Sequence, residues 1–368
     1  MRVERFESTH YRNLAGGRIE FGPGLNFVIG PNGQGKTNLL EAIYFFRFGK
    51  SFRAQTDAEL IHFDQPFGRV EVDARFADGR GERFALSLER GDGGRVKKSL
   101  KVDGVLLSRR ADLAGRFPAV LFGPHDLRVV SGEPEHRRRF LDMIGTMTDP
   151  AYLRAAVESR RVVEQRNAAL KARATRAEMA AWNERLVESG TDLIVLRRGL
   201  ASAIERETEA QAKDLGSPFT FGMRYESSVL AERSAEDRAS IVQTFNEEVI
   251  RRMAEEIRRG VTLVGPHRDD LEMKMDGQDV RKFGSQGQRR LLAVLVKLAE
   301  MAYLERELRE PCVLLLDDVF SEFDEAIIGK LQRLLEGARQ VFVTSPVPAA
   351  VASRAHVLHV DAGRIAPA

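Results

Sequence analysis

One stretch decides the fold class of this chain: Gly30-Pro31-Asn32-Gly33-Gln34-Gly35-Lys36-Thr37. It follows a short apolar run at 26–29 and precedes a helix-like stretch at 38–46, so the pattern G-x-x-x-x-G-K-T lies between a predicted strand and a predicted helix. Glycine-rich backbone can turn its N–H groups around phosphate groups, and the N-terminus of the following helix adds a favourable dipole. We therefore predict a phosphate-binding loop in an α/β fold. The alternative is a glycine-rich turn that binds nothing.

The residue types of this loop predict ATP and Mg²⁺ as its ligands. The Lys36 ammonium would reach the β and γ phosphates, and the Thr37 hydroxyl would ligate Mg²⁺. Backbone N–H groups of the other loop residues would surround the phosphates. The predicted nucleotide-binding residues of this segment are Gly30, Pro31, Asn32, Gly33, Gln34, Gly35, Lys36, Thr37 and Asn38.

A second element of the site is an apolar strand at 312–316 that ends in two carboxylates, Asp317 and Asp318. Asp317 would hold Mg²⁺, and Asp318 would polarise the attacking water. The alternative is a core strand that simply leaves into an acidic loop. Lys36 and Asp317 lie much farther apart along the chain than a compact GTPase-like core requires, so a sizeable insert must separate them.

Three regions of the chain differ in their residue pattern. Short alternating runs before about residue 130 predict strands, whereas Ala-, Glu- and Arg-rich stretches between about 134 and 260 predict helices. After residue 261 the α/β pattern returns, and we expect the two ends of the chain to build one sheet. We predict an N-terminal part at 1–133, a helical lobe with a short arm at 134–260, and a C-terminal part at 261–368. The predicted elements are strands at 69–76, 83–89, 97–102, 313–316 and 341–344, a hairpin at Asp276-Gly277, helices at 287–308 and 326–336, and breaks in the helical region at Gly190, Gly199 and Gly216.

The composition is that of an ordinary soluble globular protein. Of the 368 residues, 43% are hydrophobic and 30% are charged, and no apolar run is long enough to cross a membrane. The charged amino terminus lacks a signal peptide, and a single cysteine, Cys312, allows no intrachain disulfide, so we expect a cytoplasmic protein. The pair His356 and His359 has no cysteine nearby, which disfavours a metal site. The net charge of +3 permits a nucleic-acid partner without requiring one.

A third motif, at 283–290, places Ser285 at the start of an apolar helix, where a hydroxyl and glycine N–H groups suit an anion. An ordinary serine N-cap is the alternative. The order of the motifs resembles that of ATP-binding-cassette (ABC) ATPases, with 321–324 in the place of the D-loop. The resemblance implies an α/β ABC-type ATPase head with an antiparallel β subdomain. It also implies that Ser285, Gln286, Gly287 and Gln288 face the phosphate-binding loop of a second copy, with ATP held between the two subunits.

Several segments resemble the RecF family of bacterial DNA replication and repair proteins. They are 11–14, 38–42, 49–53, Gly265-Pro266-His267-Arg268-Asp269-Asp270-Leu271, 285–289 and 315–322, and they span the chain from residue 1 to about 360. The resemblance implies that Arg12 and Asn13 join the nucleotide site. It further implies action at single-strand gaps and duplex junctions, help to RecO and RecR in loading RecA, and a part in SOS induction. The segment 265–271 is physically only a charged turn, and a solvated loop is as good an interpretation as a nucleotide contact.

The chain departs from the general ABC pattern in three places. Asp318 stands where many ABC ATPases have Glu, and its shorter side chain predicts slow hydrolysis. No Q-loop glutamine occurs near 121–127, so His125 or Asp126 would take that place. Thr344-Ser345 replaces the usual switch histidine, and a hydroxyl can hydrogen-bond phosphate but cannot carry a positive charge.

Basic residues concentrate in the predicted arm. Between residues 154 and 176 the chain has seven basic and two acidic side chains. Such a helix can track DNA phosphates without reading bases, although a solvated helix face is the alternative. Aromatic residues are nearly absent here, which disfavours base stacking and favours duplex or junction backbone. The candidate DNA contacts are Arg154, Arg160, Arg161, Arg166, Lys171 and Arg173.

Together, these features predict an ATP-switched DNA clamp that dimerises around ATP and hydrolyses it slowly. A scaffold in which ATP binding alone acts, without a need for hydrolysis, is one alternative. A soluble ATPase serving a membrane transporter is a weaker one, because the Leu-Ser-Gly-Gly-Gln signature of transporter cassettes is absent. We expect DNA, a second copy of the chain, and RecR- and RecO-type proteins as partners, and no membrane.

Overall fold

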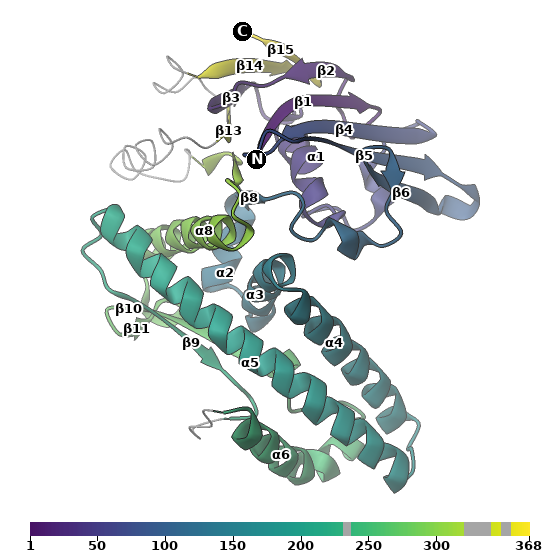
Figure 1. Ribbon diagram of the computed structural model, residues 1–368, viewed down its shortest axis with the longest axis vertical. Coiled ribbons are helices and arrows are strands. Elements are labelled where there is room, and N and C mark those ends of the chain that lie inside the picture. The colour runs from purple at the N-terminus through teal and green to yellow at the C-terminus, as the bar shows by residue number, and fades with distance from the viewer. Residues whose placement is uncertain (231–236, 320–339, 347–354) are drawn as a thin grey trace. The chain divides into compact units, whose positions relative to one another are not determined.

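Two structural units make up the chain, as the computed structural model shows (Figure 1). The structure describes residues 1–230, 237–319, 340–346 and 355–368. The first unit contains Met1–Asp126 and Met301–Ala368, and the second contains Leu127–Glu300. The predicted boundary at residue 261 is therefore wrong, because the segment that follows pairs its strands with the helical region. The predicted helix at 326–336 and the D-loop residues at 321–324 lie outside the described residues.

A mostly parallel sheet forms the centre of the first unit. Its strand order is β15-β14-β3-β13-β12-β8, with β15 antiparallel to β14 and the other pairs parallel. The N-terminal strand β3 lies between the C-terminal strands β13 and β14, which confirms that both ends of the chain build one sheet. β8, β12 and β13 are buried along their full length, as parallel strands covered on both faces usually are. The strands are β3 (Leu25–Ile29), β8 (Ala119–Phe122), β12 (Val313–Leu316), β13 (Val341–Ser345), β14 (His356–Asp361) and β15 (Arg364–Pro367).

Parallel pairing brings the carboxyl ends of three strands to one edge of this sheet. The phosphate-binding loop follows β3, Asp317 follows β12, and Thr344 lies near the end of β13. In open α/β sheets, ligands bind at this edge. The sheet therefore brings the two predicted halves of the nucleotide site together although they are far apart in sequence.

The second sheet of this unit is antiparallel, with the order β2-β1-β4-β5-β6-β7. Helix α1 (Lys36–Phe48) packs against it through Phe46, whose ring centroid lies 5.9 Å from that of Phe84. The same helix contacts the parallel sheet, because the Arg47 guanidinium donates to the Ala119 carbonyl at 2.7 Å. The predicted antiparallel β subdomain is confirmed. Its strands are β1 (Arg2–Thr9), β2 (Gly17–Glu20), β4 (Phe67–Arg75), β5 (Gly81–Arg90), β6 (Val96–Val102) and β7 (Val105–Leu106).

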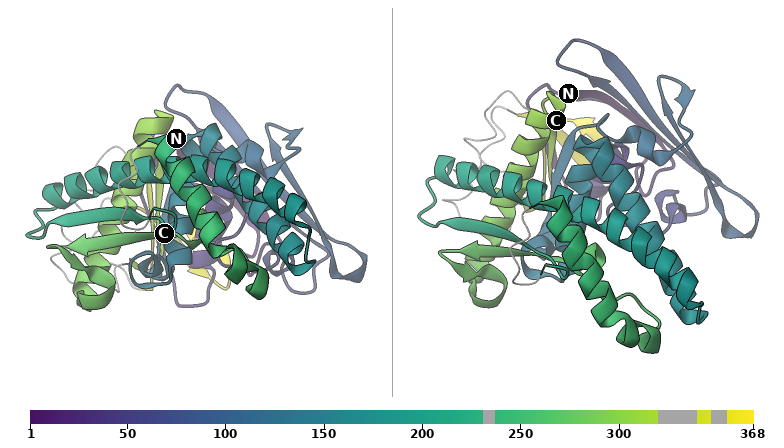
Figure 2. Two further views of the ribbon diagram at one scale, coloured as in Figure 1. Left: turned by 90° about the horizontal axis from the view of Figure 1, so that it is seen from below. Right: turned by 60° about the horizontal axis from the view of Figure 1, so that its bottom comes forward.

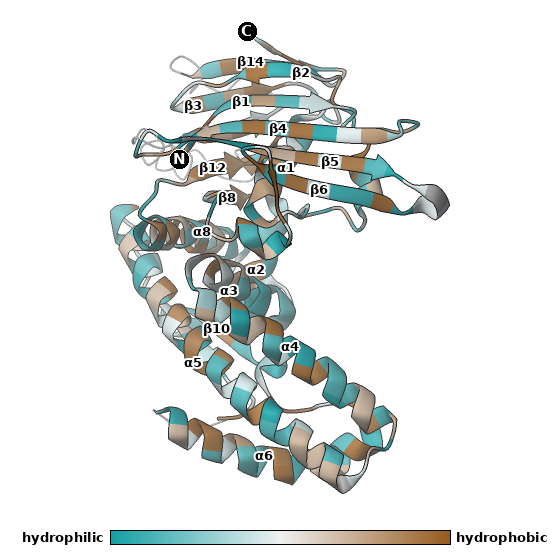
Figure 3. Cartoon of the chain, turned by 45° about the vertical axis from the view of Figure 1, so that its right-hand side comes forward, coloured by the Kyte–Doolittle hydropathy of each residue, from teal (hydrophilic) through white to brown (hydrophobic). Residues whose placement is uncertain are grey.

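The second unit is mainly helical, and α4 and α5 run side by side in it (Figure 2). Its core joins apolar residues of α4, α5 and α6, and α6 alternates apolar and polar residues along its length (Figure 3). The helices are α2 (Leu127–Ser131), α3 (Pro134–Thr148), α4 (Pro150–Lys171), α5 (Arg176–Asp214), α6 (Arg238–Arg259), α7 (Val280–Phe283) and α8 (Gln286–Leu308), the last of which ends in the first unit.

The predicted helix breaks at Gly190 and Gly199 are wrong, because α5 runs through both positions. The helix ends at Asp214, just before the predicted break at Gly216, and it begins at Arg176, where Thr175 and Glu178 form a reciprocal capping box. Gly190 serves close packing: a Cβ atom there would lie 2.5 Å from the ring of Phe245 in α6. A glycine inside a helical pattern can thus allow a close helix contact rather than end the helix.

A small three-stranded sheet in the order β11-β10-β9 completes the second unit. The hairpin predicted at Asp276-Gly277 joins β10 (Asp270–Met275) to β11 (Gln278–Asp279) and is confirmed. β9 (Phe221–Glu226) lies in the region predicted to be helical, and this strand was missed. The short 3-10 helices in the described residues are η1 (Asp57–Leu60), η2 (Asp92–Gly94), η3 (Arg110–Leu113), η4 (Pro124–Asp126) and η5 (Pro266–Arg268).

No helix in the described part of the chain is both long enough and apolar enough to cross a bilayer.

Candidate nucleotide-binding site

The loop between β3 and α1 has the backbone conformation that a phosphate cradle requires. Gly33 has φ +81° and Gly35 has φ +117°, values that residues with a side chain rarely adopt. A Cβ atom at Gly33 would meet open space, so steric crowding does not explain that glycine. Backbone geometry therefore accounts for Gly33.

The Lys36 side chain folds back over this loop. Its ammonium donates hydrogen bonds to the carbonyl oxygens of Gly30 at 2.6 Å and Pro31 at 3.0 Å. Burial lowers the pKa of Lys36 below its ordinary value, and the nearby Asp318 and Asp317 carboxylates only partly offset this effect. The predicted phosphate-binding cation thus lies among the backbone groups of the loop itself.

Asp317 lies where the loop and the end of β12 meet. One of its carboxylate oxygens accepts hydrogen bonds from the Thr37 and Thr344 hydroxyls, both at 2.9 Å. Burial raises the pKa of Asp317, and these two hydrogen bonds act in the opposite direction. The structure therefore brings together the two residues predicted to hold Mg²⁺, and a hydroxyl beside a carboxylate is a donor set that fits this ion.

Thr344 fixes both acidic residues of the strand end. Its hydroxyl donates to Asp317 and accepts a hydrogen bond from the Asp318 backbone N–H at 2.9 Å. Asp318 has φ +53°, an uncommon conformation for a residue other than glycine. Thr344, predicted to stand in the place of the switch histidine, is thus hydrogen-bonded to the carboxylate that is predicted to hold Mg²⁺.

These groups line one cavity of the first unit. Its lining contains most of the predicted phosphate-binding residues together with both acids and Thr344. Arg12, Asn13, Gly30, Pro31 and Gln34, which were predicted to bind the nucleotide, do not line it. The lining residues are Asn32, Gly33, Gly35, Lys36, Thr37, Asn38, Arg53, Asp317, Asp318 and Thr344.

Arg53 is the lining residue that sequence reasoning missed. Its guanidinium donates to the Glu41 carboxylate at 2.9 Å and also contacts Asn38. The only sequence signal was its place in the RecF-like segment 49–53, which carries no evident chemistry of its own. In the folded chain, this segment places the Arg53 guanidinium in the wall of the cavity.

Glu41 organises the charges beneath the loop. Its carboxylate is fully buried and accepts two hydrogen bonds from Arg12, at 2.9 and 2.8 Å, and one from the Ser51 hydroxyl at 2.5 Å. Burial alone would raise the pKa of Glu41, but the hydrogen bonds from Arg12, Arg53 and Ser51 outweigh burial and hold it below its usual range. Arg12 therefore supports α1 through Glu41.

Asn13 supports the loop from outside the cavity. Its side-chain amide donates to the Gly33 carbonyl at 2.8 Å, and its amide oxygen accepts from the Asn38 side chain. Neither residue predicted to take the place of the Q-loop glutamine lines the cavity. His125 is exposed, and Asp126 accepts a hydrogen bond from the Gly123 backbone N–H at 2.8 Å.

The residues predicted to form the signature motif lie at the start of α8 in the second unit. The Gln288 backbone N–H donates to the Ser285 hydroxyl at 3.2 Å, and the Gln288 side chain accepts from the Ser285 backbone at 2.8 Å. This reciprocal pair is a capping box, so Ser285 does cap the helix. Ser285, Gln286 and Gly287 are exposed, and the preceding Phe283 is 70% exposed.

The comparison with known proteins identifies the family. The RecF/RecN/SMC N terminal domain model matches residues 2–362. DNA replication and repair protein RecF of Heliobacterium modesticaldum is 36% identical over 351 residues, which cover 94% of this chain and 92% of the relative. The chain belongs to the RecF family. RecF of Symbiobacterium thermophilum is 39% identical over 339 residues, covering 91% of this chain and 88% of the relative.

Solved structures agree with the RecF assignment. A structure of the recombination mediator protein RecF-ATPrS in the RecFOR pathway matches with a TM-score of 0.91 and 28% identity. The match covers 100% of this chain and 98% of that one. The α/β fold with its antiparallel sheet and helical unit is therefore the fold of RecF proteins.

The RecF-like segment 265–271 is a buried anchor within the second unit. The Asp269 carboxylate is 1% exposed and accepts hydrogen bonds from the Tyr225 hydroxyl at 2.5 Å and the Ser228 backbone at 2.7 Å. Burial raises the pKa of Asp269 above its ordinary value. The Pro266 carbonyl accepts from Arg197 of α5 at 2.7 Å. A solvated loop is therefore the wrong interpretation of this segment.

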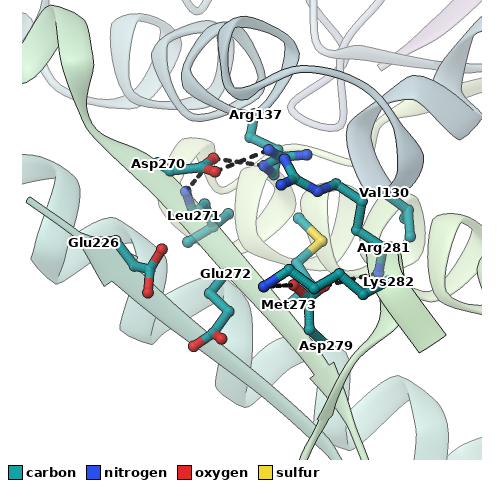
Figure 4. A pocket seen from close by; sticks show the side chains of 10 residues that line it. All are labelled: Val130, Arg137, Glu226, Asp270, Leu271, Glu272, Met273, Asp279, Arg281 and Lys282. Atoms are coloured by element: carbon teal, nitrogen blue, oxygen red, sulfur yellow. Dashed lines mark hydrogen bonds and ion pairs between the residues drawn. The ribbon is translucent and has the colours of Figure 1, made fainter. Parts of the chain in front are cut away.

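A polar cavity lies beside the same segment (Figure 4). Inside it, Asp270 pairs with Arg137 of α3 at 2.6 Å, and Lys282 pairs with Asp279 at 3.4 Å. Most charges that line the cavity thus balance one another within the unit. The lining residues are Val130, Arg137, Glu226, Asp270, Leu271, Glu272, Met273, Asp279, Arg281 and Lys282.

The candidate DNA contacts divide into two groups. Arg166 is fully buried and pairs with Glu256 of α6 at 2.5 Å, so its prediction as a DNA contact is wrong. Arg160 is 82% exposed and pairs with Glu164 one turn away on the same helix. The remaining candidates are all exposed: Arg154, Arg161, Lys171 and Arg173.

Proposed function

We propose that this RecF-family protein is an ATP-switched DNA-binding protein of recombinational DNA repair and replication. One observation carries the proposal: Lys36, Thr37 and Asp317 converge on one cavity at the carboxyl edge of a parallel sheet. A RecF structure described with ATP matches the chain at a TM-score of 0.90 and supports ATP as the ligand.

In this proposal the loop binds the phosphates of ATP. Lys36 supplies the positive charge, and the N–H groups of the loop supply the cradle. Thr37 and Asp317 would hold Mg²⁺, which when bound would neutralise negative charge on the phosphates. Asp318 orients the attacking water, and its short side chain makes turnover slow.

Two copies of the chain would dimerise around ATP. The exposed residues Ser285, Gln286 and Gly287 at the start of α8, together with Gln288, form a helix N-terminus suited to a phosphate group. In the dimer they would face the loop of the second copy, so ATP would stabilise the interface and hydrolysis would weaken it.

DNA would bind through its phosphate backbone. The exposed side chains Arg154, Arg161, Lys171 and Arg173 provide the charge, and release of counterions makes such binding sensitive to salt. We further propose that the protein acts at gaps and duplex junctions, works with RecR- and RecO-type proteins to load RecA, and supports SOS induction.

Sedimentation tests the clamp. Wild type, Lys36→Met and Ser285→Arg are compared with Mg²⁺ and ATP or ADP, with and without a labelled gapped duplex, at two salt concentrations. We expect only wild type with ATP to dimerise and to carry DNA more weakly at high salt. A wild type that stays monomeric with ATP, both with and without DNA, would refute the trans role of Ser285.

A scaffold that needs ATP binding but no hydrolysis is the second candidate. It differs from the clamp in the effect of Asp318→Asn. The clamp predicts persistent dimers that fail to release DNA, whereas the scaffold predicts normal dimers and normal repair. A transporter ATPase would instead associate with membranes and show no DNA affinity.

A further inference from the structure

The turn that joins β14 to β15 near the C-terminus has an unusual backbone. Ala362 has φ +45° and Gly363 has φ +78°, while Asp361 and Arg364 on either side pair across the hairpin. Positive φ at both central residues matches a tight two-residue hairpin turn, in which alanine is disfavoured. The turn is therefore well defined, and Ala362 holds a strained backbone conformation in it.

Both N–H groups of this turn bind a single residue of the phosphate-binding loop. The Ala362 N–H donates to the side-chain oxygen of Gln34 at 2.6 Å. The Gly363 N–H donates to the backbone carbonyl of Gln34 at 3.0 Å. Gln34 does not line the nucleotide cavity, so its side chain is turned to this contact.

The same hairpin makes two further close approaches, one to Asn13 beside the loop and one to Gly30 of the loop itself. A Cβ atom at Gly363 would lie 1.9 Å from the Asn13 carbonyl oxygen, and Asn13 in turn binds the Gly33 carbonyl. A Cβ atom at Gly30 would lie 2.1 Å from the Val360 carbonyl of β14. Gly30 and Gln34 of the loop therefore lie against the hairpin itself. Gly33 is linked to the hairpin through Asn13.

We propose that the Ala362-Gly363 turn is a positioning element of the nucleotide site. It holds Gln34 so that the flexible residues Gly33 and Gly35 keep the curvature that points their N–H groups at phosphate. Glycine loses much conformational freedom when it is ordered, so a loop ordered before binding binds its ligand more tightly. The inference rests on the proposed binding of ATP by this loop.

The expected signature is an equal loss of ATP and ADP affinity. The curvature of the loop serves the phosphates that both nucleotides share, whereas Asp318, which we propose orients the attacking water, serves only the terminal phosphate of ATP. When the turn is disturbed, we expect the Kd for each nucleotide to rise about tenfold, because two hydrogen bonds that order the loop are weakened.

Gly363→Ala is the direct test, and Gly104→Ala is its matched control. Gly104 lies in the turn between β6 and β7 with φ +79°, and a Cβ atom there meets nothing within 4 Å. The two substitutions impose similar backbone strain, but only the first pushes against Asn13, whose side chain binds the Gly33 carbonyl of the loop. Calorimetric Kd values for Mg-ATP and Mg-ADP are compared with the unfolding midpoints of the ligand-free proteins.

Gln34→Met is the second variant, for the case in which Gly363→Ala does not fold. It keeps the length of the side chain and removes the acceptor for the Ala362 N–H. Equal losses of ATP and ADP affinity, with an unfolding midpoint no lower than that of Gly104→Ala, support the positioning role. Wild-type affinities in Gln34→Met, or a loss confined to ATP, overturn it. Failure of wild type itself to bind ATP refutes the proposed function instead.

Discussion

Replacing Arg166 by alanine should destabilise the helical unit without acting through DNA. Its guanidinium donates to Glu256 at 2.5 Å, to Asn183 at 3.0 Å and to Thr262 at 2.9 Å, linking α4, α5 and α6. Both partners of the Arg166–Glu256 pair are fully buried. In the variant, the Glu256 carboxylate keeps a hydrogen bond from the Leu263 N–H but loses its counter-charge.

The magnitude follows from this burial. Breaking a buried ion pair by removing one partner costs about 3 to 5 kcal/mol, because an uncompensated charge remains in the interior. Arg160→Ala is a matched control on the same helix, because Arg160 pairs with Glu164 at 2.9 Å in solvent. Exposed pairs of this type contribute no more than about 0.5 kcal/mol.

Urea unfolding, followed by circular dichroism at 222 nm, measures both effects on the full chain. We expect a large loss in Arg166→Ala, a negligible loss in Arg160→Ala, and partial recovery when Arg166 and Glu256 are both replaced by methionine. A loss below about 1 kcal/mol in Arg166→Ala would refute the account of this pair. A loss of DNA affinity with unchanged stability would restore Arg166 as a DNA contact.

Three further outcomes are expected. Burial, reinforced by nearby arginines, lowers the pKa of His267 from 6.5 to about 4, so the stabilising effect of the neutral ring is complete above pH 6.5 and is lost as pH falls toward 4. From pH 7 to 5 the free energy of unfolding should therefore drop by about 2 kcal/mol more in wild type than in His267→Gln. Equal drops in the two proteins would contradict this expectation. Thr344→Val removes a hydrogen bond to Asp317, so the Mg²⁺ concentration that half-saturates ATP binding should rise several-fold, whereas Thr344→Ser should behave like wild type. An unchanged Mg²⁺ dependence in Thr344→Val would show that Thr344 does not support the Mg²⁺ site. Arg161→Ala should weaken DNA binding at low salt and reduce its salt dependence while leaving ATP affinity unchanged, and an unaltered salt slope would exclude Arg161 from the DNA surface.

Neighbouring residues were enough to predict the local elements of the fold and the residue types of the nucleotide site. The G-x-x-x-x-G-K-T pattern depends only on neighbouring residues, which form a strand, a glycine turn and the start of a helix. The phosphate-binding loop could therefore be predicted directly. The alternating runs that became β4, β5 and β6 and the acidic end of β12 were readable for the same reason. The roles predicted for Thr37 and Asp317 as ligands of one Mg²⁺ ion also required the two side chains to meet, and they do.

Features that depend on contacts between distant residues could not be predicted in this way. Arg166 belongs to a basic run in the sequence, yet packing of α4 against α6 buries it beside Glu256. Gly190 suggests a helix break in the sequence, but in the structure it allows Phe245 to pack closely against the helix. Segment 265–271 is an ordinary charged turn until Tyr225, Ser228 and Arg197 bind it. In each case a local pattern fixes the backbone preference, but the partner that determines burial and charge lies tens of residues away, and only the folded chain brings the two together.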